Sequence, residues 1–261
     1  MIILLVPAFV CAEENKIGGS AAKQPVKVGL FEAIDQGLIE AKIVAKSSLD
    51  GRVTVRSKAD VPLQIQLPEA FAAVPLYQFE DMGGGLDSGS SGGRGSRGDR
   101  GGSSSGGGQN QSSGGGFGGS SGMGGSSGMF NIAPEHIIRQ DVKMVCLEHG
   151  KKEPARHIAY ELRPIETVSD KKEVQMLCNL VGSGAVNQRA AQAAVWHYAN
   201  GMSWEELANK RGKVRIDSPF TVPYFTREQM LYAMNLGKKV EEKLAEKKET
   251  KKEKVIGGSG E

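Results

Sequence analysis

The chain has little net charge, few cysteines and no apolar stretch that predicts a membrane span. Its 261 residues contain 33 Lys and Arg against 30 Asp and Glu, a formal net charge of +3. That balance is too close to neutral to indicate a nucleic-acid or anionic-membrane surface. The apolar run at residues 1–12 would cover about 18 Å as a helix, against roughly 30 Å of hydrocarbon. We therefore expect no transmembrane span, and the charge does not favour a nucleic-acid partner.

The apolar run instead predicts a signal peptide. It is interrupted only by Pro7 and ends in Val10-Cys11-Ala12, which fits the small-x-small pattern before a cleavage site. No Lys or Arg precedes it. We expect a signal peptide over residues 1–12 and export to the periplasm or cell envelope. A hydrophobic terminus that packs on the first domain is the alternative.

Glycine, by contrast, is abundant and concentrated. Residues 83–129 are almost wholly Gly and Ser and hold more than half of the 36 glycines. With so few apolar side chains to bury, this composition predicts a disordered linker between two domains. Arg94, Arg97 and Arg100 lie among the glycines, as in segments that bind RNA. RNA binding is therefore a third-ranked hypothesis, because such segments usually carry more arginines and interleaved aromatics.

The predicted fold class is α+β, and its first part is a small β-rich domain over residues 26–80. Strands are expected at 39–46, 52–58 and 63–67, with turns between them. Val53, Val55, Ile65 and Leu67 alternate with polar neighbours, so this small antiparallel β-sheet should bury one face. The domain has no His, Cys or Trp. Binding or spacing is therefore a better interpretation of it than catalysis.

The second part, residues 130–236, is predicted to be a mainly helical domain with a few strands. Strands are expected near 142–147 and 157–164, and helices at 171–180, 188–199, 203–212 and from 226 onward. Ser203-x-x-Glu206 and Thr226-x-x-Gln229 match the capping box that begins a helix. Residues 238–261 are dominated by Lys and Glu, which predicts a charged helical or disordered tail.

The cysteines carry the most specific chemical prediction. Loss of Cys11 with the signal peptide would leave Cys146 and Cys178, and an even pair in an exported protein suggests a disulfide. Two buried free thiols are the main alternative, because free Cys packs as a small hydrophobe.

A metal site is a further possibility for these cysteines. Cys146 and His149 form a Cys-x-x-His pair that Cys178 and His197 would complete to four zinc ligands. A single short chelate with no matching second half is a weak signal, so we expect no cofactor. A hydrolase-like Cys/His pair would use Cys146 with His149 or His197.

Two segments resemble the motif order of bacterial thioester adhesion domains. These are Val145-Cys146-Leu147-Glu148-His149-Gly150-Lys151 and Ala191-Gln192-Ala193-Ala194-Val195-Trp196. The resemblance implies an internal thioester, with Cys146 as the thiol and Gln192 as the acyl donor. Ala191 stands where that family has Thr, and Val145 and Leu147 stand where it has aromatic residues.

The whole arrangement resembles more closely an uncharacterised family of exported planctomycete-type proteins. The shared features are the segment Leu67-Pro68-Glu69-Ala70-Phe71-Ala72-Ala73-Val74-Pro75, a Gly-rich linker, the Cys-Leu-Glu-His-Gly segment and a Gln-Ala-Ala-x-Trp-His helix. This resemblance implies a two-domain architecture and export, and no activity. We therefore predict an exported, non-enzymatic binding or structural protein that acts on an unknown envelope component or protein. A covalent adhesin or hydrolase-like protein using Cys146 is the alternative.

Overall fold

The computed structural model describes residues 24–76, 111–117, 128–213 and 219–256. Within them, the chain builds one closed barrel, with the strand order β2-β3-β8-β6-β5-β9. The strands are β2 (Ile39–Ala45), β3 (Asp50–Ser57), β5 (Phe71–Pro75), β6 (Ser113–Gly115), β8 (Ile137–Cys146) and β9 (Tyr160–Pro164). Every neighbouring pair in the barrel is antiparallel.

A second sheet joins strands from distant parts of the chain. β1 (Val26–Gly29) pairs in parallel with β4 (Leu63–Gln66), and β4 pairs antiparallel with β7 (Met129–Ile132). The short helix α1 (Leu30–Asp35) follows β1 directly. Leu30, Leu63 and Ile65 join the side chains inside the barrel in one buried cluster. The small sheet and α1 therefore extend the barrel core.

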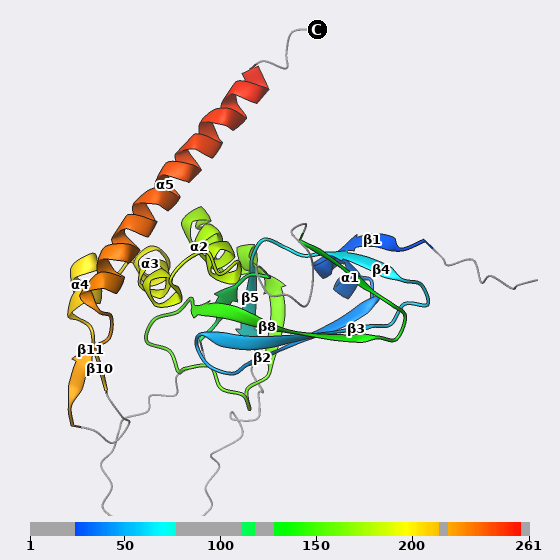
Figure 1. The fold of residues 1–261 in the computed structure, drawn as a ribbon, viewed down its shortest axis with the longest axis horizontal. Helices are drawn as coiled ribbons and strands as arrows, with labels where there is room; N and C mark the ends of the chain where they lie inside the picture. Colours follow the sequence, from blue (N-terminus) through cyan, green and yellow to red (C-terminus); the bar gives the residue numbers. More distant parts are fainter. Residues whose placement is uncertain (1–23, 77–110, 118–127, 214–218, 257–261) are drawn as a thin grey trace, which may run out of the picture.

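The helices after α1 come late in the chain and pack on one another and on the barrel. They are α2 (Lys172–Gly182), α3 (Gln188–Asn200), α4 (Trp204–Asn209) and α5 (Arg227–Ile256); a 3-10 turn (Ile165–Thr167) precedes α2, and the hairpin β10 (Arg211–Lys213) and β11 (Thr221–Pro223) precedes α5. Figure 1 shows α5 crossing α3 and then running out from the molecule. No helix of the described residues is long and apolar enough to cross a membrane.

Side chains alternate between two cores along β8. Met144 lies in the barrel core, whereas the next residue, Val145, belongs to a cluster that includes Leu177 of α2 and Ala194 of α3. This period of two is what a strand imposes when both of its faces are covered. The barrel is therefore filled by its own side chains, and its outer face receives α2 and α3.

Several sequence predictions hold at the level of elements. The structure contains both helices and strands, so the α+β class is confirmed. Val53 and Val55 are buried between exposed or half-buried neighbours on β3. Ser203 and Glu206 form the predicted capping box at α4, and Thr226 exchanges equivalent bonds with Gln229 before α5. The charged tail is helical as far as Ile256.

The predicted separation of a small β-sheet from a helical domain is not what the structure shows. The barrel takes β2, β3 and β5 from the range 26–80, and β8 and β9 from 130–236. The reason is physical: alternation along a strand indicates a buried face, but it does not say which strands share the edge. Seven registered pairs between β3 and β8 cross the proposed domain boundary.

The predicted disordered linker is also wrong for its middle portion. Residues 111–117 are described, their first six residues are buried, and Ser113–Gly115 forms β6 between β5 and β8. Residues 128 and 129 of the predicted linker are also described, and Met129 begins β7. Linker residues 83–110 and 118–127 lie outside the described residues, as do the predicted signal peptide at 1–12 and the three linker arginines.

Candidate functional site

A polar cleft of about 620 Å³ opens where the β2–β3 turn, β8 and the end of α2 meet. It is lined by Lys46, Ser47, Asp50, Gly51, Asp141, Val142, Lys143, Arg156, Gly182, Ser183 and Gly184. Its volume falls in the range of small-molecule sites. The cleft draws its charged residues from both sides of the predicted linker, so no single segment of sequence could reveal it.

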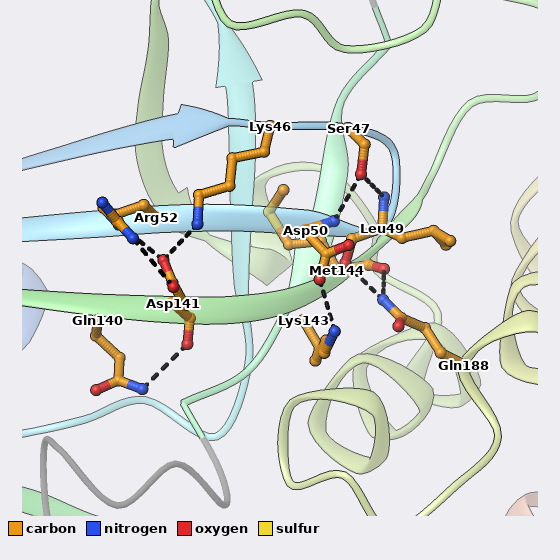
Figure 2. A network of polar contacts seen from close by, with 10 residues as sticks. All are labelled: Lys46, Ser47, Leu49, Asp50, Arg52, Gln140, Asp141, Lys143, Met144 and Gln188. Atoms are coloured by element: carbon orange, nitrogen blue, oxygen red, sulfur yellow. Dashed lines mark hydrogen bonds and ion pairs between the residues drawn. The ribbon is translucent and has the colours of Figure 1, made fainter.

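Ion pairs along β8 organise the charges of this cleft (Figure 2). Asp141 accepts a hydrogen bond from Lys46 Nζ at 2.7 Å, and others from Arg52 Nε at 2.7 Å and Nη2 at 3.1 Å. These bonds, led by that from Arg52, hold the pKa of Asp141 well below its usual range. Lys143 Nζ donates to Asp50 at 2.6 Å. Both carboxylates are thus paired, and Asp141 is shared by two cations.

The cleft therefore carries an excess of positive charge. Three cations in its lining, Lys46, Lys143 and Arg156, face two carboxylates, Asp50 and Asp141, which leaves a formal excess of one. Arg52, outside the lining, also pairs with Asp141. Arg156 is exposed and forms no ion pair with any described residue. An anion placed in the cleft would meet cations that the local carboxylates do not fully neutralise.

The turn between β2 and β3 is fixed by its own side chain. Ser47 Oγ accepts hydrogen bonds from the backbone N–H groups of Leu49, at 3.2 Å, and Asp50, at 3.1 Å. Ser and Thr hydroxyls commonly stabilise turns in this way. The turn sets Lys46 and Asp50 at the rim of the cleft, so their positions follow from local backbone structure.

Two glutamines of α3 attach the helix to the edge of β8. Gln188 Nε2 donates to the carbonyl oxygens of Leu49 (2.5 Å) and Met144 (2.7 Å). One turn later, Gln192 accepts from the Cys146 N–H at 2.7 Å and donates to the Cys146 carbonyl at 2.9 Å. Side chains four residues apart on a helix are about 6 Å apart, close to the ~6.8 Å between alternate strand residues. The two amides therefore replace β3 as a partner where its pairing with β8 ends.

The predicted disulfide between Cys146 and Cys178 is wrong. Both cysteines are free and buried. The physical reason is β6, which lies between them: Ser113 is the register partner of Cys146, and a Cβ built on Gly114 would lie 2.5 Å from Cys178 Sγ. Cys146 packs in a cluster with Trp196 and Cys178 in another with Leu177. The alternative of two buried free thiols matches the structure.

Burial also suppresses the chemistry of these thiols. It raises the pKa of Cys178 to about 12, and it raises the pKa of Cys146 further, with a contribution from the charge of Glu153. The thiolate is the nucleophilic form of cysteine. Cys146 Sγ contacts the Ser48 carbonyl at 3.9 Å, a weak bond of the protonated thiol.

The four predicted metal ligands do not assemble. No group of three or more His, Cys, Asp or Glu side chains among the described residues is arranged to hold a metal ion. Cys178 is enclosed in its own core. His197 Nδ1 bonds to the Met202 carbonyl at 2.7 Å, and its ring stacks on Trp204. The predicted zinc site at Cys146, His149, Cys178 and His197 is therefore contradicted.

His149 has a different partner from those predicted. Lys210 Nζ donates to His149 Nε2 at 2.7 Å and lies above the rings of Trp196 and Tyr224. Burial and the neighbouring ammonium lower the pKa of His149, and burial lowers the pKa of Lys210. His149 thus packs at an aromatic corner as an acceptor, instead of activating Cys146.

Cys146 and Gln192 are the one predicted pair that the structure brings together. Both hydrogen bonds of the Gln192 amide go to the Cys146 backbone, and the thiol points to Ser48. Sequence reasoning missed Gln188 and the charged cleft. The spacing of Gln188 and Gln192 on one helix was a usable signal, whereas the pairing of Asp141 with Lys46 and Arg52 depends on the strand register alone.

Comparison of the chain with protein-family models, curated proteins and solved structures finds no match.

Proposed function

We propose that the chain is an exported, non-enzymatic binding protein whose cleft takes a small multivalent anion. The observation that carries this proposal is the excess of positive charge around a cleft of about 620 Å³. Arg156 and Lys143 lie on its wall, while Ser47 and Ser183 supply hydroxyl groups. Cations at a concave surface raise the local concentration of anions. The chemistry that fits is a phosphate or polycarboxylate group.

The chemistry of the cysteines supports binding over catalysis. A Cys/His nucleophile needs the imidazole within hydrogen-bond reach of sulfur. Here His149 bonds to Lys210 and His197 to a backbone carbonyl. The raised pKa values of both thiols leave very little thiolate at neutral pH.

The binding proposal can be tested by titrating the full chain with inorganic phosphate and with citrate at low salt, using calorimetry. We expect Lys143→Ala combined with Arg156→Ala to weaken binding at least tenfold. Arg163→Ala is the matched control, because the exposed side chain of Arg163 pairs with Glu161 on β9, outside the cleft. Absence of binding by both anions at millimolar concentration, or equal loss in the control, would contradict the proposal.

Export is tested separately by the intact mass of the protein secreted from a native host. The basis is the apolar run and the Val10-Cys11-Ala12 site, which lie outside the described residues. We expect a mature chain that begins at Glu13. Retention of Met1 in the secreted material would contradict cleavage after Ala12.

An internal thioester is the second candidate, favoured by one observation, the contact of the Gln192 amide with Cys146. Sulfur would attack the amide carbon and expel ammonia, so that the denatured, unreduced chain would lose about 17 Da. The proposed binding protein should instead show the full mass, and both thiols should react with iodoacetamide once unfolded. The mass alone therefore separates the two candidates.

A further inference from the structure

β6 completes the barrel although its sequence, Ser-Gly-Gly, does not predict a strand. Its three residues pair on one side with β5, through Phe71, Ala72 and Ala73, and on the other side with β8, through Met144, Val145 and Cys146. Without β6, both of these buried strand edges would expose unpaired N–H and C=O groups. Such groups are almost always satisfied in folded proteins. The gap between β5 and β8 is thus shaped to receive an extended strand.

At three successive positions the gap is too tight for a side chain unless a neighbouring group moves. A Cβ on Gly114 would lie 2.5 Å from Cys178 Sγ, and one on Gly115 would lie 2.6 Å from the Lys143 carbonyl oxygen. A Cβ on Gly116 would lie 3.0 Å from the Glu69 carbonyl oxygen. The two contacts with backbone oxygens cannot be relieved by rotating a side chain. The gap therefore selects a Gly-Gly-Gly peptide by steric exclusion.

Contacts at both ends set the register of the strand. Phe117 follows the glycines, and its ring lies 4.8 Å from that of Phe71. At the other end, Gln111 N–H donates to the Lys152 carbonyl at 3.1 Å, and the Ser112 carbonyl accepts from the Leu147 N–H at 3.0 Å. These contacts fix the position of the strand in the gap, and of the two ends only Phe117 is held by its side chain.

We propose that the gap between β5 and β8 is a strand-acceptor site, which the chain fills with its own β6 and which also accepts β6 from a second copy. Strand addition of this kind draws affinity from main-chain hydrogen bonds and specificity from the side-chain pockets. Exchange between copies reproduces every contact of the closed barrel. It therefore costs little beyond the entropy of association.

The chain length on the N-terminal side of β6 permits the exchange. Residues 77–110 separate β5 from residue 111 and could span on the order of 100 Å if extended. On the other side, residues 118–127 join the segment to β7 and could span on the order of 30 Å, so the exchange requires the neighbouring acceptor site to lie within that distance of β7.

The sequence supplies a matched pair of peptide probes. Residues 109–118 contain the bound segment, whereas residues 101–110 repeat Ser-Ser-Gly-Gly-Gly eight positions earlier, with Gln109 in the place of Phe117. The two peptides have equal length and similar composition. Their comparison tests the residues that flank Ser-Ser-Gly-Gly-Gly, Phe117 among them.

The acceptor site is tested in the full chain carrying Gly115→Val, which cannot insert its own strand. We expect the labelled 109–118 peptide to bind this variant at least tenfold more tightly than the wild-type chain, by fluorescence anisotropy. The 101–110 peptide should bind at least tenfold more weakly than 109–118. Gly29→Val is the control variant, because a Cβ at Gly29 meets nothing nearer than 3.8 Å. Equal binding by the variant and the wild type would overturn the proposal.

If the Gly115→Val chain does not fold alone, its refolding with added peptide tests the acceptor site instead. Refolding it with the 109–118 peptide should then restore the native circular dichroism spectrum, and no recovery with the peptide would overturn the acceptor site.

Exchange between copies needs its own test. Gly182→Leu blocks the site, because a Cβ there would lie 2.2 Å from the Gly116 backbone, and it leaves the strand sequence intact. Mixed with Gly115→Val, it should form a one-to-one heterodimer in light scattering after chromatography. Two monomer peaks would overturn acceptance of a second copy's strand.

Discussion

The exposed ion pairs around Asp141 and the amides of Gln188, half-buried, and Gln192, buried, all involve β8 and differ in what they do. Asp141 holds two cations at a surface where its side chain is 57% exposed. Gln192 is 2% exposed and satisfies both backbone groups of Cys146. Water competes for the bonds of Asp141 and is excluded from those of Gln192. The charged set is therefore available to a ligand, while the amide set holds α3 on the barrel.

The largest effect on stability should come from Gln192→Leu, which removes the buried amide. The substitution leaves the N–H and C=O of Cys146 without a partner in a buried setting, so we expect a loss of about 2 to 5 kcal/mol in the free energy of unfolding. Urea denaturation measures it. Gln36→Ala, which removes one exposed bond to Glu32, is the control and should change stability by less than about 0.5 kcal/mol.

A somewhat smaller loss is expected from Gly182→Ala. Its methyl group would meet the backbone of Gly116 at 2.2 Å, so α2 must shift away from the residue that follows β6. We expect this shift to lower the free energy of unfolding by about 1 to 3 kcal/mol. Gly29→Ala is the matched control. Equal stability of the two variants in thermal unfolding would show that α2 does not contact residue 116 as described.

Among the exposed ion pairs, Asp141→Asn should lower the free energy of unfolding by at most about 1 kcal/mol, because surface ion pairs contribute little to stability. The loss should shrink at about 1 M NaCl, where charges are screened. The same variant should bind phosphate more tightly, since Lys46 and Arg52 lose their carboxylate partner. Glu161→Gln, at the exposed pair with Arg163, serves as the control. Weaker phosphate binding by Asp141→Asn would contradict the assignment of the cleft.

The smallest effect should be a pH dependence at His149. Its pKa is lowered in the folded protein from an unfolded value near 6.5, so the unfolded chain binds more protons in this range. This contribution to stability is complete above about pH 6.5 and is lost as the pH falls through the folded pKa. In urea denaturation at several pH values, His149→Gln should weaken the dependence of the free energy of unfolding on pH. His136→Gln, at an exposed residue, should leave that dependence unchanged. An unchanged slope in His149→Gln would show that another group titrates.

The sequence predicted individual elements better than their assembly. The capping boxes at Ser203 and Thr226 are local, because both partners lie within one helical turn. The partnership of β3 with β8 joins Val53 to Gln140 and depends on contacts far apart in the chain. β6 could not be predicted from composition, because Gly and Ser give no apolar signal even when their backbone is buried.

The candidate site was predictable only in fragments. The sequence paired Cys146 with Gln192 because a thiol and an amide can react. In the structure the Gln192 amide instead bonds to the backbone N–H and C=O of Cys146. A disulfide was predicted from cysteine number, which contains no information on the strand that lies between the thiols. The cleft was missed because Asp50 and Lys143 meet only once the barrel has closed.

The order of strands around the barrel also has a kinetic consequence. β2 and β3 form a hairpin from adjacent segments, whereas β8, β9 and β6 must find partners across long stretches of chain. Non-local pairings slow folding, because loop entropy is lost before the contacts form. Glycine loses more conformational freedom on ordering than any other residue. We therefore expect the hairpin to form early and β6 to pair with its neighbours last. The amide protons of β6 should then exchange with solvent sooner than those of β3.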